Sequence, residues 1–408
     1  MGTYINRILA IFWVMTLLLA CKSPGGKTSD GTELDICETT DSSSAIIPEY
    51  AKGFSVRYLA NGVRLVDVKD PQKGEEDETE ESDGQAIKSD SPHANMPNEY
   101  KLALVEKGFK GEIPEGYTLI EVPVERIICM TSLQISNFTA LDSHENIVGI
   151  TGTKNLFDKD ILARVEEGSI VKIGMEGNFD TEKVIASQPD LIIISPFKRG
   201  GYETIKETGI TLIPHLGYKE PDPLGQAEWI KYVSMFIGKE EEANKIFEGI
   251  RDRYNSVKSL AANVSSRPSV FSGEMHGGNW FAIGGRNYLA KMFQDAGAEY
   301  VFSDDNHSGG IPIDFERMYK AASDADYWRI LNSFQGDFSY DALKSSDSRN
   351  EDFKAFRQKH VIYCNMKAGP YYEITPVEPD VVLKDLVFVF HPELLPDDFQ
   401  PTFYKLLK

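Results

Sequence analysis

The chain has 408 residues, of which 41% are hydrophobic and 26% are charged, and its formal net charge is −20 at pH 7. This length suits two globular domains with a sizeable buried core. The negative charge argues against nucleic acid as a partner, because proteins that bind phosphates need basic surfaces. Part of the charge comes from one acidic run, residues 75–81, so it indicates no particular partner.

The first twenty residues are predicted to be a secretory signal rather than part of the fold. Arg7 is followed by an apolar stretch, Ile8–Leu19, which is short for a membrane-spanning helix. The stretch ends in LLAC, which resembles the lipobox of bacterial lipoproteins, with Cys21 as the lipidated residue. An ordinary signal peptide with an incidental cysteine is the alternative. We expect an exported protein, lipid-anchored at a bacterial cell membrane and facing the periplasm.

Three further cysteines are present, Cys37, Cys129 and Cys364. An odd number in an exported protein leaves at least one thiol free or paired between molecules. Cys129 and Cys364 fall in predicted core strands, so we interpret both as buried thiols. No CxxC pair occurs, and a zinc site built from cysteines is therefore not expected.

Between the anchor and the main body we expect a flexible tether and a small β-rich add-on. Residues 21–45 are rich in Ser, Thr, Gly and Asp, as flexible linkers are. The add-on covers residues 46–122, and its first strands are predicted to join in a type I′ turn at Asn61-Gly62. It comprises a hairpin over Phe54–Val68, an acidic insert at 69–98, and strands at Tyr100–Val105 and Tyr117–Val124.

From Arg126 onward short apolar runs alternate with helical patterns, which is typical of a mainly parallel α/β sheet. One long amphipathic helix is predicted over Glu240–Asn263, where apolar residues recur at helical spacing and the other face is charged. A helix of that length between two lobes would act as a rigid strut. The expected strands are Ile127–Met130, Ile147–Ile150, Ile170–Ile173, Leu191–Ile194, Ile210–Ile213, Ser269–Ser272, Tyr300–Phe302, Tyr327–Leu331 and Val361–Cys364.

One stretch, Phe179–Ser195, is echoed by a second, Ile313–Ile330. In the first, Asp180 is expected to cap a short helix that ends near Pro189, and a wholly apolar strand follows. In the second, Asp314 begins a short amphipathic helix, and an Asp-rich break precedes the next strand. Two units of one design predict two similar lobes.

The spacing of acidic residues in the two units also agrees. Glu182 lies eight residues before Asp190, and Glu316 lies eight residues before Asp324. Acidic side chains in a first helical turn are favoured by the helix dipole, so simple capping explains Glu182 and Glu316 without any function.

Several motifs, taken in order, carry a resemblance to a known family. They are PVERII at 123–128, ENIVGI at 145–150, Glu182 with QPDLI at 188–192, the long helix, NYL at 287–289 with AGA at 296–298, and HPEL at 391–394. This succession resembles the substrate-binding proteins of iron-complex and vitamin B12 ABC importers over roughly residues 122–400. The resemblance implies two lobes joined by a rigid helix, a metal chelate bound between them, and delivery to a permease dimer. It implies no catalysis and no resident cofactor. The β-rich add-on has no counterpart in the family pattern.

The resemblance also assigns a role to two acidic residues. In that family one Glu on each lobe docks onto arginines of the permease, and the matching positions are Glu182 and Glu316.

The loops that follow each strand are where a ligand is expected, because ligands of open α/β sheets bind beyond the carboxyl ends of the strands. Lys198 and Arg199 would offer positive charge to a chelate, and Trp280 could stack on a flat one. Alternatively, Lys198 and Arg199 lie on a solvated surface loop, and Trp280 covers the edge of the lobe without contacting a ligand. For Tyr371 and its neighbour Tyr372, the sequence does not decide between cleft and core. The candidate ligand-binding residues are Lys198, Arg199, Tyr202, Tyr218, His276, Asn279, Trp280, His307 and Tyr371.

A ferric siderophore is the cargo that we expect first, and other cargoes and other classes of protein are the alternatives. Cobalamin and haem share the same role, and haem would need an axial ligand such as His276, Tyr202 or Tyr371. A zinc or manganese site could draw on His215, His276 and His307, but no His-rich loop or helical His pair occurs, so none is expected. An enzyme is not expected, because the sequence contains no P-loop, HExxH or GxSxG motif and no GxGxxG motif that opens a helix after a strand. A surface adhesin that uses the add-on is a further alternative.

We therefore expect a monomeric solute-binding lipoprotein that captures an iron complex and hands it to an ABC permease. The predicted organisation is a signal peptide at 1–20, a tether at 21–45, the add-on at 46–122, an α/β lobe at 123–238, a linking helix at 239–264 and a second α/β lobe at 265–408.

Overall fold

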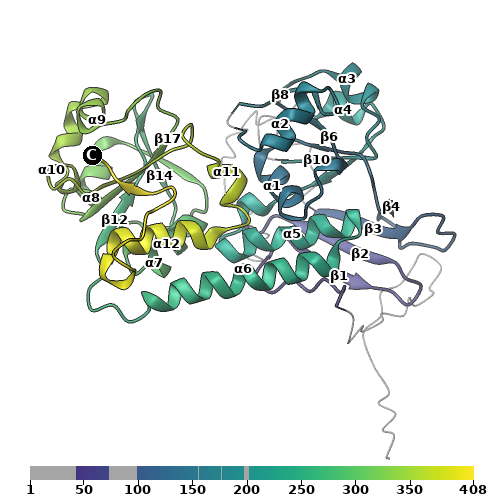
Figure 1. Cartoon of the computed structure of the whole chain (residues 1–408), viewed down its shortest axis with the longest axis horizontal. Coiled ribbons are helices and arrows are strands. Elements are labelled where there is room, and N and C mark those ends of the chain that lie inside the picture. Colours follow the sequence, from purple (N-terminus) through teal and green to yellow (C-terminus); the bar gives the residue numbers. More distant parts are fainter. Residues whose placement is uncertain (1–42, 73–98, 155, 176, 197–201) are drawn as a thin grey trace, which may run out of the picture.

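The computed structural model describes residues 43–72, 99–154, 156–175, 177–196 and 202–408. Two α/β lobes stand side by side above two helices, α5 (Pro223–Ile237) and α6 (Glu240–Leu260) (Figure 1). Helix α6 has 21 residues, which at 1.5 Å per residue makes it about 32 Å long. The mixed α/β fold with two mainly parallel sheets is confirmed. The predicted signal sequence, Cys21, Cys37 and most of the acidic insert lie outside the described residues.

The add-on forms a four-stranded sheet in the order β1-β2-β3-β4. The first three strands are antiparallel, and β3 and β4 run parallel. The expected type I′ turn at Asn61-Gly62 is wrong. Leu59 instead accepts from the N–H of Gly62 and donates its own N–H to Val63, and among these residues the left-handed backbone occurs at Gly62 (φ 84°). The loop is thus one residue longer than a two-residue turn. The strands are β1 (Phe54–Tyr58), β2 (Arg64–Lys69), β3 (Glu99–Glu106) and β4 (Thr118–Val122).

The first lobe is a parallel sheet in the order β7-β6-β5-β10-β11. Its central strands are buried at every position, as expected for a sheet covered on both faces. The strands are β5 (Ile127–Cys129), β6 (Ile147–Ile150), β7 (Val171–Lys172), β10 (Leu191–Ile194) and β11 (Thr211–Pro214), with a small hairpin of β8 (Gly174–Met175) and β9 (Asn178–Phe179). Its helices are α1 (Ser132–Ala140), α2 (Lys159–Glu166), α3 (Thr181–Ala186) and α4 (Glu203–Lys206), and its 3₁₀ turns are η2 (His144–Asn146) and η3 (Gly217–Lys219).

The second lobe has a five-stranded sheet in the order β15-β12-β17-β18-β19, beside a smaller sheet in the order β13-β14-β16. The C-terminal strand β19 runs antiparallel to β18. The strands are β12 (Ser269–Ser272), β13 (Met275–His276), β14 (Asn279–Ile283), β15 (Glu299–Tyr300), β16 (Gly310–Ile313), β17 (Tyr327–Asn332), β18 (Val361–Asn365) and β19 (Lys405–Leu406). The helices are α7 (Tyr288–Asp295), α8 (Phe315–Ala322), α9 (Tyr340–Ser346), α10 (Lys354–Arg357), α11 (Tyr371–Ile374) and α12 (Pro379–Phe390), with 3₁₀ turns η4 (Ser348–Asp352) and η5 (Pro392–Leu394).

The repeated helix–strand unit occupies the same place in both lobes. Strand β10 follows the short Asp-capped helix α3, and strand β17 follows the short Asp-capped helix α8. Strand β10 pairs with β5 and β17 pairs with β12, so both strands lie beside the first strand of their lobe. The residue before each strand is an Asp that holds the neighbouring strand. Asp190 accepts from the N–H groups of Glu125 and Arg126, and Asp326 accepts from the N–H of Ser269. The partner of Asp190 is therefore Asp326, and the expected match with Asp324 is wrong.

Buried carboxylates tie the two ends of the described chain to interior helices. Glu228 on α5 and Glu220 just before it accept hydrogen bonds from five successive backbone N–H groups, residues 49–53. Asp385 on α12 accepts likewise from residues 402–404, at 2.6–2.9 Å. All three carboxylates are at most 1% exposed. Burial of such groups is tolerated because each is surrounded by donors.

Candidate functional site

A pocket of about 450 Å³ lies at the carboxyl ends of the strands of the first lobe. The loops that leave parallel strands converge at this edge, which is where ligands of open α/β sheets bind. Its wall begins at Cys129 and Ile150, the last residues of β5 and β6, and at Ser195, which directly follows β10. The remaining lining residues are Met130, Thr131, Ser132, Leu133, Ile135, Thr151, Gly152, Lys154, Met175, Tyr218 and Tyr372. We call this pocket the strand-end pocket.

The N-terminus of helix α1 opens into the strand-end pocket. Thr131 caps the helix in a capping box with Gln134, whose amide also donates to the hydroxyl of Ser195 (3.1 Å) and accepts from the N–H of Met130 (2.6 Å). These bonds hold the ends of β5 and β10 to the first turn of α1. A helix N-terminus carries about half a positive charge, and the side chain of Lys154 adds a full one. The pocket is therefore suited to a ligand with an anionic or polar group.

Three successive residues of α11 link the second lobe to this pocket. The hydroxyl of Tyr371 bonds that of Tyr404 inside the second lobe (3.0 Å). Tyr372 is 42% exposed and reaches the lining of the strand-end pocket. Glu373 accepts from the N–H groups of Phe157 and Asp158 in the first lobe (2.7 and 2.8 Å). In Figure 1, α11 accordingly lies between the lobes, beside α1. The pocket is thus built on the first lobe and completed by the second.

The predicted tyrosines divide between the pocket and the core. Tyr218, on η3, lines the strand-end pocket, and its contact with a ligand stays a prediction. The predictions for Tyr202 and Tyr371 are wrong, because both side chains are at most 2% exposed. Tyr202 donates to the carbonyl of Ser195 and stacks on Phe179. The aromatic residue of α11 that reaches the pocket is the next one along, Tyr372.

The predicted residues of the second lobe are not brought into the strand-end pocket. Trp280 is fully buried, and its indole N–H donates to the carbonyl of Ser272 (3.1 Å). Stacking of Trp280 on a ligand is therefore a wrong prediction, because strand β14 turns this side chain inward, against the aromatic residues Phe271, Trp328 and Phe353. His276 and Asn279 flank the exposed turn between β13 and β14, and His307 is exposed and pairs with Asp305 (2.9 Å). None of these three lines the pocket.

Lys198 and Arg199 lie outside the described residues, so their predicted role stays a prediction. Among the described residues, Lys154 is the cation that lines the strand-end pocket. It follows β6, on one of the loops that the strand-end argument selects.

Two cysteines and one histidine that lie in or directly follow core strands are buried in the core. Cys129 and Cys364 are free and buried, as predicted, and burial raises the pKa of the Cys364 thiol to about 12 and that of Cys129 further. His215 is fully buried, and desolvation lowers its pKa to about 3. The imidazole faces Asn137 and packs on Trp229. His215 is therefore not positioned to share a cargo metal with His276 and His307.

Two larger hollows lie elsewhere on the molecule. One of about 860 Å³ borders α7 and β15, and its lining includes Ser269 and Glu299, which begin β12 and β15. Another of about 700 Å³ lies beside β19 and is lined by the second lobe alone. Neither hollow is lined by residues at the carboxyl ends of strands from both lobes. The strand-end pocket is therefore the better candidate despite its smaller volume.

Two features of the sequence mark the strand-end pocket. The T-x-x-Q pattern from Thr131 to Gln134 is a capping box, which marks the helix N-terminus that opens into the pocket. Tyr371 and Tyr372 follow a Gly-Pro pair on a strand-end loop. Which of two adjacent tyrosines faces the pocket depends on the start of a four-residue helix, and no sequence pattern sets that start.

Glu182 and Glu316 occupy matching places. Each is exposed, and each is the second residue of a helix whose N-cap is an Asp: Asp180 for α3 and Asp314 for α8. The cap bonds measure 3.1 and 2.7 Å. Because an Asp is the N-cap of each helix, neither Glu is needed as the cap, although each lies where the helix dipole favours an acidic side chain.

Comparison with known proteins agrees with this architecture. Residues 127–368 match the family described as periplasmic binding protein, which is more than half of the chain. The chain belongs to this family. An uncharacterized lipoprotein of Methanocaldococcus jannaschii, MJ0878, is 29% identical over 300 residues, which is 70% of this chain and 69% of the relative. A second uncharacterized lipoprotein of that organism, MJ0872, is 28% identical over 321 residues, 76% of this chain and 80% of the relative.

Solved structures of binding proteins share the fold. A periplasmic haem-binding protein from Pseudomonas aeruginosa matches with a TM-score of 0.55 and 17% identity, over 70% of this chain and 98% of that one. An ABC-type Fe³⁺-hydroxamate transport system protein from Saccharomonospora viridis matches with a TM-score of 0.52 and 19% identity, over 67% and 95%. Both likenesses concern the fold. Across the described part of the chain, no helix has the length and apolar character needed to cross a membrane.

Proposed function

We propose that this periplasmic binding protein captures a metal chelate, a ferric siderophore in the first place, in the strand-end pocket and delivers it to an ABC permease. The observation that carries the proposal is the pocket itself, which is formed on one lobe and completed by Tyr372 of the other. A ligand held there contacts both lobes. The fold neighbours named for haem binding and for Fe³⁺-hydroxamate transport support this class of cargo.

The chemistry of the pocket favours a chelate over a bare ion. Its described lining offers hydroxyl groups, two methionines, two tyrosines and Lys154, but no imidazole and no carboxylate. Such a set suits an organic ligand with a polar or anionic edge, and the volume falls within the usual range for small-molecule sites. A zinc or manganese ion would need imidazole, carboxylate or thiolate ligands, and the one thiol in the described lining, Cys129, has its pKa raised by burial and stays protonated.

Cobalamin and haem are the alternative cargoes for the same pocket. Haem would need an axial ligand, and Tyr372 is the exposed tyrosine placed to supply one, since Tyr202 and Tyr371 are buried. Cobalamin is nearly neutral and would gain less from Lys154 and the α1 N-terminus.

Delivery is proposed to use Glu182 and Glu316, one on each lobe, as contacts with cationic residues of a permease dimer. Their matching positions beside the repeated strand support the pairing. We further propose a monomer, lipid-anchored through Cys21 and facing the periplasm, and the naming of two relatives as lipoproteins supports the anchor.

Ligand-dependent stabilisation tests the proposal. Ferric siderophores, haem and cobalamin are each added to the protein, and the thermal midpoint is recorded. A ligand at 100 times its Kd adds about 2.7 kcal/mol to the free energy of unfolding. The variant Tyr372→Ala is expected to bind the responsive ligand at least about tenfold more weakly, whereas Phe281→Ala, an equally exposed aromatic outside the pocket, keeps wild-type affinity. Indifference to all three classes, or equal loss in both variants, would contradict the proposal.

A further inference from the structure

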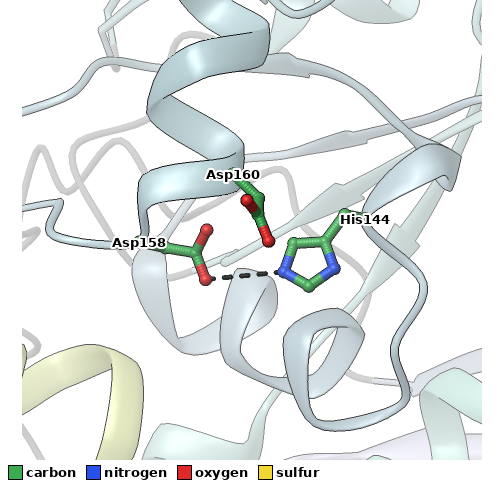
Figure 2. Close-up of side chains that lie close together, drawn as sticks. All are labelled: His144, Asp158 and Asp160. Atoms are coloured by element: carbon green, nitrogen blue, oxygen red, sulfur yellow. Dashed lines mark hydrogen bonds and ion pairs between the residues drawn. The ribbon is translucent and has the colours of Figure 1, made fainter.

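A second cluster of metal-ligating side chains lies outside the strand-end pocket, at the start of helix α2. Single donor atoms of His144, Asp158 and Asp160 all lie within 4.8 Å of one another. Figure 2 shows that the imidazole of His144 faces both carboxylates, and the dashed line joins its Nε2 to Asp158 Oδ2 at 3.4 Å. His144 comes from η2, Asp158 is the N-cap of α2 and Asp160 lies in its first turn, so two separate elements converge here.

The donor set and its spacing suit a divalent transition-metal ion. Bonds of about 2.0–2.2 Å to nitrogen and oxygen place two ligands of one ion roughly 3–4 Å apart. The His144–Asp158 separation of 3.4 Å already fits this range. The carboxylate of Asp160 is exposed and makes no hydrogen bond or ion pair with the other described residues, so no partner among them competes with a metal for it. An imidazole among the ligands favours a transition metal such as zinc or cobalt over calcium and magnesium, which prefer oxygen alone, and the two carboxylates also suit manganese.

The surrounding charges also favour a cation. Asp142 lies on the far side of the imidazole, with its Oδ1 3.9 Å from Nδ1 of His144, too far for a hydrogen bond but near enough to add negative charge. The nearby cation Arg164 is engaged with main-chain carbonyls, those of His144 and Ile147 among them. The N-terminus of α2 opposes a cation with about half a positive charge, against two full negative charges from Asp158 and Asp160.

Capping explains only part of the arrangement. Asp158 is the N-cap of α2, since its Oδ1 accepts from the N–H of Ile161 (2.9 Å). That bond leaves Oδ2 turned to His144. Neither the cap nor the ion pair requires Asp160 to converge on the same point. The geometry points to a binding site for one divalent transition-metal ion, held by His144, Asp158 and Asp160 and separate from the cargo pocket.

This site adjoins the contact between the lobes. The N–H of Asp158 donates to Glu373 of α11, the residue after Tyr372. The proposed metal site is therefore directly beside the donor of an inter-lobe hydrogen bond.

Titration of the full-length protein with ZnCl₂, MnCl₂ or CoCl₂ by calorimetry tests the site, with MgCl₂ and CaCl₂ as comparisons. One ion per chain is expected, and His144→Ala and Asp160→Asn should each weaken it at least tenfold. Asp158 is left unchanged because it caps α2. The controls His276→Ala and His307→Ala remove exposed histidines elsewhere and should bind as wild type.

Bound Co²⁺ gives a second reading, since its visible absorption reports nitrogen and oxygen coordination and should be lost in His144→Ala. Circular dichroism confirms that each variant is folded. No binding at one ion per chain, wild-type affinity in His144→Ala, or loss of binding in the control variants would each overturn the assignment.

Discussion

The two lobes contain the same helix–strand unit but place it in sheets of different order. In the first lobe β6 and β7 both lie beyond β5, whereas in the second only β15 lies beyond β12 and an antiparallel strand closes the other edge. The two units nevertheless agree in detail. In each, the Asp that precedes the strand accepts a hydrogen bond from the backbone at or just before the start of the neighbouring strand. Local sequence therefore specifies the unit, and the connections around it specify the sheet.

The strand ends of the two lobes differ more than their units do. In the first lobe they surround the strand-end pocket. In the second, the chain after β12 forms the small sheet β13-β14-β16 and buries Trp280 against the core. The second lobe contributes to the pocket mainly through α11. The candidate site is therefore asymmetric, whereas Glu182 and Glu316 occupy matching places in the two lobes.

The largest expected effect concerns Glu182 and Glu316. Reversing both charges, Glu182→Arg with Glu316→Arg, should abolish transport in a reconstituted permease assay and leave ligand affinity unchanged. Each side chain is exposed and is not the N-cap of its helix, so stability should change little. Reversal of Arg317, an exposed neighbour on α8, to Glu is the control and should transport normally. Lost ligand affinity in the double variant would refute the docking role.

Trp280→Ala distinguishes a core residue from a ligand contact. Removal of a fully buried Trp should lower the free energy of unfolding by about 3–5 kcal/mol, measured by urea denaturation. Below its lowered melting temperature the variant should still bind ligand as wild type does, because Trp280 is outside the pocket. A large loss of affinity with normal stability would restore the stacking role.

Asp385 makes the stability of the second lobe depend on pH. Desolvation raises its pKa to about 6, and the hydrogen bonds from Phe403, Tyr404 and Thr402 lower it less. The unfolded carboxyl titrates near 4, so the stabilising contribution of the protonated form is complete below pH 4 and is lost as pH rises to about 6. A shift of two units corresponds to about 3 kcal/mol. Asp385→Asn should reduce the change in the free energy of unfolding between pH 4 and 7, measured from denaturation curves. If the variant kept the pH dependence of the wild type, the role of Asp385 would be contradicted.

The smallest expected effect compares Asp190 with Asp326. Each holds a neighbouring strand, but Asp326 also pairs with Lys354 (2.7 Å). Removal of either carboxylate to Ala should cost about 1–3 kcal/mol, and more at Asp326. Burial raises the pKa of Asp326, but the bonds from Lys354 and Ser269 outweigh it and hold the pKa below its usual value. The contribution of Asp326 to the free energy of unfolding is therefore present above pH 4 and is lost as the pH falls below 4. If Asp326→Ala lowered the free energy of unfolding equally at all pH values, that result would argue against the ion pair.

Much of the fold could be predicted because apolar runs and breaks are local signals. The strands Ile147–Ile150, Leu191–Ile194 and Ser269–Ser272 were predicted with their observed ends. The long helix was predicted over Glu240–Asn263 and ends at Leu260. The site was predicted less well. Tyr218 lines the pocket, but Tyr202, Trp280 and Tyr371 are core residues, because an aromatic side chain near a strand end suits either environment.

The sequence by itself determined the helix–strand units, the Asp caps of α3 and α8 and the parallel class of both sheets, since each follows from the polarity and spacing of neighbouring residues. Only the tertiary structure decided which aromatic side chain reaches the pocket, where Glu373 bonds across the lobes, and that His144 meets Asp158 and Asp160. Those contacts join residues distant in the chain, and their geometry depends on the packing of whole elements, which no local pattern encodes.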